Sequence, residues 1–262
     1  MIKTENLVAE LEVRGYEVIT KTVVKNGVEK EGIMIITDSN VNPIVYTENY
    51  KSFDSVEDAV DNIIETIGTS PKPVADDVIS LLKDSDYVYS HVKVAMQRIS
   101  TEPLVKIPCE FSGIESYLYV DLGNGMTVKI TNELLKHSGL ELDKLERVAI
   151  ENTIADSHYT TIAQALGMPF LEGLCGIYVL SNSSQVRGAS AVLNKALLKE
   201  IADKHSTDKV VILPSSIHEV LVIPYDDNVK DAMALTEMAK SVNAEVVVPE
   251  EQLGDMAYTI AV

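Results

Sequence analysis

The chain of 262 residues is 46% hydrophobic and 24% charged, which is close to the average of globular domains and excludes wholesale disorder. Its formal net charge of −18 argues against direct binding to nucleic acids or anionic membranes, because both need a basic surface. No apolar run approaches the ~20 residues of a transmembrane helix, and glutamates interrupt the first residues, where a signal peptide would be apolar. We therefore expect a cytoplasmic protein.

The first part of the chain predicts a small antiparallel meander with helices. A short helix is expected to end at Gly15. Asn26 and Gly27 form a strong two-residue hairpin signal, because both residue types tolerate positive φ. Strands are expected on either side of this turn and once more after it, over residues 16–24, 28–37 and 44–46.

Two helices are predicted next. Ser55 is a candidate N-cap, and apolar residues follow it at helical spacing up to Gly68. After a proline-containing linker, a longer helix is expected over 76–99. The polar segment that follows this helix is the best domain boundary. It divides the chain into an N-terminal domain, 1–100, and a C-terminal domain, 101–262.

The C-terminal domain predicts a mixed α/β region. Strands are expected over 105–111, 116–122, 126–130, 176–180, 210–213, 220–223 and 244–248. Helices are expected over 131–139, 142–150, 160–166, 189–205 and 227–242, with a last helical turn over 250–258. Helices and strands alternate, but many neighbouring strands look antiparallel, so we assign the α+β class.

The most suggestive polar cluster lies between two strand-like runs and contains Ser215, Ser216, His218 and Glu219. Serine, histidine and a carboxylate form nucleophilic triads, so Ser216 and His218 are candidate catalytic residues. In an extended loop, however, these two share one face while Glu219 points to the other, and no GxSxG motif occurs. A structural or binding loop is therefore favoured, and a catalytic pair would need a carboxylate from a distant segment.

A second polar loop, 181–188, joins a strand to a helix and contains Asn182 and Arg187. Free N–H groups at the start of a helix can hold an anion, and Arg187 adds a positive charge. The loop lacks the GxGxxG and GxxxxGK[ST] patterns, so no nucleotide cofactor is expected. It is either a capped connection or an anion-binding loop.

Metal and redox chemistry find little support in the sequence. The five histidines are scattered without an HxxxH or HExxH pair, and no CxxC motif occurs, so neither a metal site nor another cofactor is expected. Cys109 and Cys175 are expected to be reduced thiols, as is usual in a cytoplasm.

The acidic charge is unevenly distributed. Residues 48–86 contain ten acids and three bases, and residues 226–262 contain eight acids and two bases. The ordinary explanation is solvated helix faces that aid solubility. The alternative is an acidic docking surface for a basic protein partner.

Several short motifs, spread over nearly the whole chain, carry a family resemblance. They are KNGV at 25–28, GI at 32–33, NPIVY at 42–46, ENT at 151–153, IYVLSN at 177–182, GA at 188–189, ILPSSIHEV at 212–220 and PEEQL at 249–253. On these motifs the chain resembles a family of unknown function from Firmicutes, common in gut species, and is distantly similar to the YtpQ-like family. The proline that often follows Glu-Asn-Thr in the family is Ile154 here, so we expect that turn to differ. The resemblance implies an intracellular bacterial or mobile-element protein, with no specific activity, cofactor or catalytic residue.

These observations favour a non-enzymatic cytoplasmic module of bacterial, phage or mobile-element origin that binds another protein through acidic surfaces. Nucleic acid and membrane are not expected as partners. The alternative is a hydrolase that uses Ser216 and His218. Binding residues are expected among Ser215, Ser216, His218, Glu219, Asn182 and Arg187.

Overall fold

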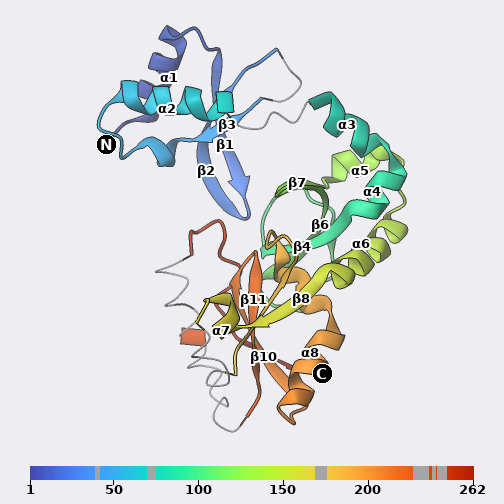
Figure 1. Cartoon of the computed structure of the whole chain (residues 1–262). Coiled ribbons are helices and arrows are strands. Elements are labelled where there is room, and N and C mark those ends of the chain that lie inside the picture. The colour runs from blue at the N-terminus through green and yellow to red at the C-terminus, as the bar shows by residue number, and fades with distance from the viewer. Residues whose placement is uncertain (39–41, 70–74, 169–175, 227–235, 238–239, 241–246) are drawn as a thin grey trace. The chain divides into compact units, whose positions relative to one another are not determined.

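The computed structural model describes the chain except for residues 39–41, 70–74, 169–175, 227–235, 238–239 and 241–246 (Figure 1). Two compact units are present, Met1–Asp84 and Ser85–Val262. Both contain helices, and each contains antiparallel β-structure. The predicted α+β class is therefore confirmed.

The first unit contains a three-stranded sheet in the order β1-β2-β3. Its elements are α1 (Thr4–Val13), β1 (Val18–Lys25), β2 (Val28–Ile35), β3 (Ile44–Tyr46), a 3₁₀ helix (Thr47–Tyr50), α2 (Val56–Thr69) and α3 (Ala75–Lys83). Lys25 pairs with Val28 directly across the turn. Asn26 and Gly27 both have positive φ, 52° and 81°, as a tight hairpin turn requires. The predicted hairpin is confirmed.

The core of the first unit lies between its helices and its sheet. Leu7 and Leu11 of α1 and Ile63 of α2 are buried together with Ile33 of β2. Leu7 and Leu11 are one helical turn apart, so a single face of α1 supplies both contacts. Ser55 caps α2 as predicted, because its Oγ accepts a hydrogen bond of 3.0 Å from the N–H of Asp58. The opposite face of α2 remains in solvent.

The helix predicted over 76–99 is wrong. The segment instead contains α3, the short helix α4 (Ser85–His91) and strand β4 (Val92–Arg98). Most side chains of β4 are buried, so its apolar residues lack the period-2 alternation that reveals a strand. Because β4 pairs with β6 of the second unit, the compact units divide after Asp84 and not near residue 100.

The second unit begins with a four-stranded sheet. Its next elements are β5 (Lys106–Ile107), β6 (Ile114–Gly123), β7 (Met126–Lys129), α5 (Asn132–Ser138) and α6 (Leu142–Asp156). β6 is the central strand and pairs with β4, β5 and β7. Thr131 caps α5 as predicted by accepting the N–H of Leu134 at 3.0 Å. The predicted strand over 105–111 is limited to β5.

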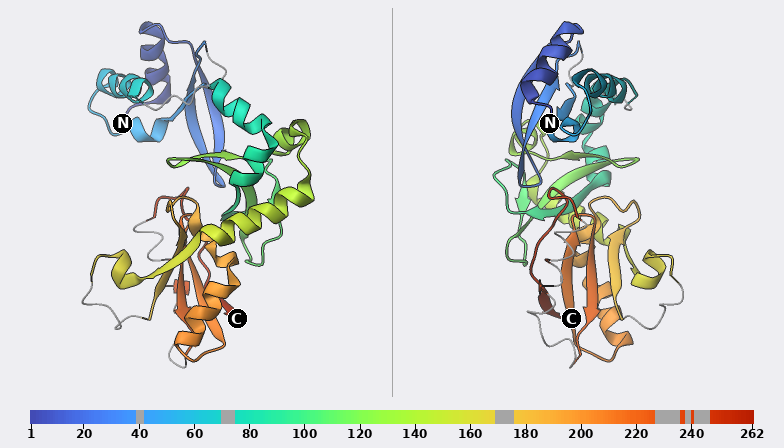
Figure 2. Two further views of the ribbon diagram at one scale, coloured as in Figure 1. Left: turned by 45° about the vertical axis from the view of Figure 1, so that its right-hand side comes forward. Right: turned by 90° about the vertical axis from the view of Figure 1, so that its left-hand side faces the viewer.

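A five-stranded antiparallel sheet, in the order β12-β10-β11-β9-β8, completes the second unit. It is built from β8 (Ser157–Thr161), α7 (Ile162–Ala165), β9 (Tyr178–Asn182), a 3₁₀ helix (Gly188–Leu193), α8 (Lys195–Lys204), β10 (Lys209–Ser216), β11 (Glu219–Pro224) and β12 (Tyr258–Ala261). α6 continues directly into β8 (Figure 2). Leu198 of α8 packs in one core with Ile212 of β10 and Met96 of β4, so both sheets share that core.

Three further expectations need correction. The helix predicted over 189–205 is interrupted at Asn194, whose side chain caps α8 by accepting the N–H of Leu197 at 3.3 Å. The last helical turn predicted over 250–258 is absent from the described residues, and Tyr258 instead begins β12. Strand β8 was not expected, because its polar sequence lacks an apolar face. The helix predicted over 227–242 and the strand over 244–248 fall largely outside the described residues.

Candidate functional site

The two polar clusters singled out in the sequence meet where β9 and β11 pair. We call the meeting point the polar junction; its members are Ser181, Asn182, Arg187, Gly188, Ser216 and His218. The backbone N–H of Arg187 donates to Nδ1 of His218 at 3.3 Å. The hydroxyl of Ser181 donates to the carbonyl oxygen of His218 at 2.8 Å. Segments more than thirty residues apart thus form one site.

Gly188 allows this close approach because it has no side chain. A Cβ at this position would lie 2.2 Å from Oγ of Ser181, 2.6 Å from the carbonyl oxygen of His218 and 2.7 Å from the backbone nitrogen of Asn182. The last two are backbone atoms, which cannot move aside without shifting the sheet. The glycine is therefore required for the loop to pack on the sheet.

Asn182 organises the loop that leads to Arg187. Its Nδ2 donates to the carbonyl oxygen of Val186 at 2.8 Å, and its Oδ1 accepts from the N–H of Val186 at 3.2 Å. Gln185 and Arg187 adopt left-handed φ values of 54° and 55°, which non-glycine residues rarely adopt. The Asn182 side chain is buried and its bonding atoms serve the loop.

Ser216 and His218 lie close together, but their side chains are not arranged as a catalytic nucleophile and general base. Oγ of Ser216 accepts a hydrogen bond of 3.0 Å from the backbone N–H of His218, so it supports the turn. Nε2 of His218 lies 3.7 Å from Oε1 of Glu251, beyond hydrogen-bond distance. Within the described residues, the side chains of Ser215 and Glu219 have no polar partner. The structure thus brings together four of the six expected residues.

The side chain of Arg187 extends from the polar junction to the four-stranded sheet. Its Nη1 donates to the hydroxyl of Tyr117 on β6, and its Nε donates to Oγ1 of Thr127 on β7 at 3.2 Å. Tyr117 is fully buried, and burial raises its pKa well above the usual value, so the phenol stays protonated. Neither partner is indicated by the sequence around Arg187.

A network of charged and polar side chains covers the same face of the sheet. Nζ of Lys129 donates to Oε1 of Gln97 at 3.1 Å and to Oε1 of Glu102 at 2.6 Å. Burial lowers the pKa of Lys129, and the nearby Glu102 only partly opposes this effect. Nε2 of Gln97 also donates to Oε1 of Glu115 at 2.8 Å. The sequence signal for this face was a period-2 pattern along β6, in which Glu115, Tyr117, Tyr119 and Asp121 alternate with mostly apolar residues. The same pattern is typical of a strand with an ordinary solvated face.

The described residues contain few other features of a chemical site. No group of three or more His, Cys, Asp or Glu side chains among them could hold a metal ion, and Cys109 is a free thiol. Cys175 lies outside the described residues. A polar hollow beside Lys93 and Tyr119 is too narrow for a water molecule, and an apolar one beside Phe111 has a volume of about 10 Å³. Small-molecule sites are typically about 300–1,000 Å³.

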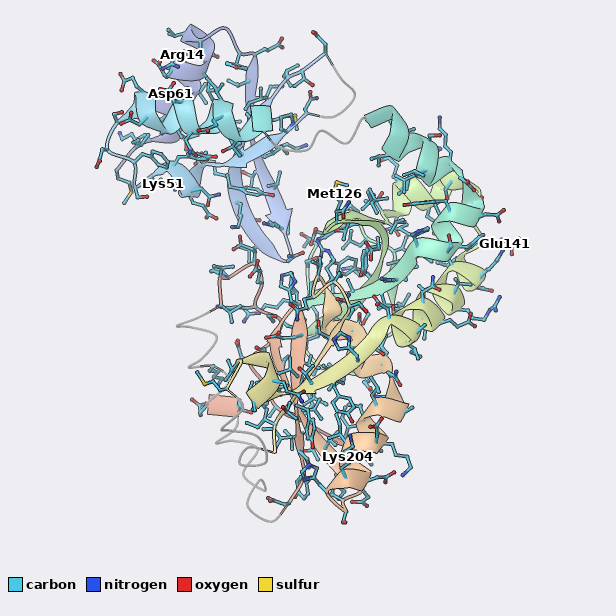
Figure 3. The ribbon with its side chains drawn as sticks, in the orientation of Figure 1. Arg14, Lys51, Asp61, Met126, Glu141 and Lys204 are labelled. Carbon is cyan, nitrogen blue, oxygen red and sulfur yellow. The ribbon has the colours of Figure 1, made fainter. Side chains whose placement is uncertain are left out.

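The first unit presents a second candidate surface, the acidic face of α2. It consists of the exposed helix residues Glu57, Asp58, Asp61 and Glu65, together with the exposed Asp54 just before the helix. α2 itself contains no lysine or arginine. Arg14 reaches this face from the end of α1 and pairs with Asp61 at 2.6 Å (Figure 3). Five of the ten acidic residues of segment 48–86 thus lie on this face or just before it.

No helix in the described part of the chain is long and apolar enough to cross a membrane. No curated protein matches the chain, and no solved structure matches it. A model of a protein family of unknown function, DUF5688, matches residues 3–260, nearly the whole sequence. The chain therefore belongs to this family of unknown function.

Proposed function

We propose that the protein is a non-enzymatic module that binds a basic partner protein through the acidic face of α2. Carboxylates at Glu57, Asp58 and Asp61 lie on the exposed side of the helix, while its apolar residues are buried in the core. Charge complementarity of this kind speeds association and selects a partner of opposite charge. Under this proposal the protein acts in a bacterial cytoplasm, encoded by the chromosome or by a mobile element.

The geometry of the polar junction supports binding over hydrolysis. A serine hydrolase needs the serine hydroxyl hydrogen-bonded to the imidazole and a carboxylate that orients the ring. Here Oγ of Ser216 is engaged by a backbone N–H, and Nδ1 of His218 accepts the N–H of Arg187. Both side chains are thus occupied in holding the backbone of the junction.

The proposal is tested by capturing partners from bacterial extract with two immobilised double variants. Glu57→Gln with Asp58→Asn removes two charges from the first turn of α2, whereas Glu133→Gln with Asp143→Asn removes two from the first turns of α5 and α6. The two variants match in net charge, and both remove carboxylates from the first turns of helices. We expect a basic protein that the wild type and the control retain, and that the α2 variant loses.

The captured protein is then purified and its affinity is measured at several salt concentrations. Affinity should fall as salt rises, because the interaction is between charged surfaces. Equal retention by all three chains would contradict a role for α2. Labelling of Ser216 by a fluorophosphonate probe, lost in His218→Ala, would instead establish the hydrolase; we expect no labelling.

A further inference from the structure

Hydrogen-bond donors outnumber acceptors around the Arg187 guanidinium. Arg187 has five N–H groups, and only Nε and one N–H of Nη1 have partners among the described residues. The hydroxyls of Tyr117 and Thr127 each accept from Arg187, and no described residue accepts their own protons. Lys129 uses two of its three N–H groups. Six donor hydrogens around one guanidinium thus lack a described protein acceptor.

The two carboxylates near Tyr117 are paired with lysines and not with Arg187. Lys106 pairs with Glu115 at 2.7 Å, and Lys129 pairs with Glu102 at 2.6 Å. No carboxylate in the described part of the chain pairs with Arg187. The site therefore carries about one net positive charge, although the chain as a whole carries −18.

The two cations lie close to the same aromatic ring. Nζ of Lys129 is 5.1 Å from the Tyr117 ring centroid, and Cζ of Arg187 is 5.9 Å from it. Arg187 also lowers the pKa of Lys129, in addition to the larger effect of burial, so the two charges repel one another. An anion that contacts both would relieve this repulsion.

Several independent contacts hold Arg187 in this position. Its backbone has a left-handed φ of 55°, its N–H is held by His218, and the next residue must be glycine. Unfavourable backbone conformations persist where several surrounding contacts hold them in place, and such positions are often ligand sites. The guanidinium is thus preorganised, which lowers the entropic cost of binding a ligand.

We propose that Arg187, Lys129 and the hydroxyl of Thr127 form a binding site for a phosphate group, either the free ion or a small phosphate monoester, while the buried hydroxyl of Tyr117 holds the guanidinium in place. A fully ionised phosphate group has several acceptor oxygens and no hydrogen-bond donor. It therefore complements a cluster of donors. Arginine binds such oxygens through two N–H groups at once. This site does not depend on the proposed acidic docking face, which lies in the other compact unit.

The test is an NMR titration of the full chain with inorganic phosphate, ribose 5-phosphate and acetate at constant ionic strength. We expect phosphate to shift the amide signals of Thr127 and Lys129 with a Kd on the order of 1–10 mM. Tighter binding of ribose 5-phosphate identifies a monoester as the ligand, and exclusive binding of phosphate identifies the free ion. Acetate carries a smaller charge and fewer oxygens, so it should bind more weakly.

Arg187→Asn removes the guanidinium while tolerating the left-handed backbone, and we expect it to weaken phosphate binding about tenfold or more. Thr127→Val keeps the side-chain shape and should weaken binding several-fold, which provides a second variant if the first does not fold. Arg147→Gln removes an exposed charge on α6 and should leave the affinity unchanged. Absence of phosphate-dependent shifts in the folded wild type, or equal affinity in all variants, would overturn the proposal.

Discussion

The backbone N–H of Arg187 donates a hydrogen bond to Nδ1 of His218 across 3.3 Å, which joins two polar loops that are separate in the sequence. His218 thereby positions the backbone of Arg187, whose side chain contacts Tyr117 and Thr127. The histidine supports a cationic site without belonging to it.

Replacing His218 should therefore destabilise the protein, and the loss should be smaller when the new side chain still accepts a hydrogen bond from the N–H of Arg187. His218→Leu leaves the Arg187 N–H without its partner and is expected to lower the free energy of unfolding by about 1–3 kcal/mol. His218→Asn offers a side-chain oxygen near the position of Nδ1 and should recover part of this loss. Urea denaturation measures both values. Equal losses in the two variants would show that the hydrogen bond contributes little.

Gly188→Ala should destabilise the second unit by about 3 kcal/mol, the upper end for overpacking, because the new methyl group meets three atoms closer than 3.0 Å. Gly176→Ala is the matched control, since among the described residues its Cβ would meet only Cε1 of His205, at an ordinary 3.7 Å. It should change stability by less than about 0.5 kcal/mol. Thermal unfolding of the two variants distinguishes them, and similar melting temperatures would contradict the close packing at Gly188.

Acid sensitivity should depend on Glu115. Burial favours its neutral form, but hydrogen bonds from Lys106, Gln97 and Ser100 outweigh burial and lower its pKa below the ordinary 4.5. A lowered native pKa means that this carboxylate contributes stability above about pH 4.5 and loses it as the pH falls through the native value. Glu115→Gln should therefore be less stable at neutral pH and lose less stability on acidification.

The control for this prediction is Glu133→Gln, which removes an exposed carboxylate at the start of α5. Because this variant retains Glu115, its unfolding free energy should fall more on acidification than that of Glu115→Gln. Chemical denaturation at several pH values gives the slopes. An unchanged slope in Glu115→Gln would mean that the network around Gln97 does not hold the carboxylate in its charged form.

Both cysteines are expected to titrate as thiols in the denatured, unreduced protein. Cys109 is free in the structure. Cys109→Ser should reduce the count from two thiols to one. A count of zero in the wild type would indicate a disulfide and contradict the expectation of a reducing compartment.

The amino-acid sequence alone determined the structural features that depend only on neighbouring residues. The Asn26-Gly27 turn, the Ser55 cap and the Thr131 cap were all predicted, because each depends on residues within a few positions. The α+β class followed from the same signals. The polar segments around Asn182 and His218 were also recognised from their composition, although their contact with one another was not.

Tertiary structure alone decided the rest. β4 reads as helix until it is paired with β6, because burial on both sides removes the alternation of a strand. Arg187 and Tyr117 are 70 residues apart, and nothing near either residue indicates the other. Their contact exists because the Asn182 loop packs on the sheet at Gly188 and turns Arg187 toward β6. Long-range packing, which brings together groups that no local pattern links, therefore created the candidate phosphate site.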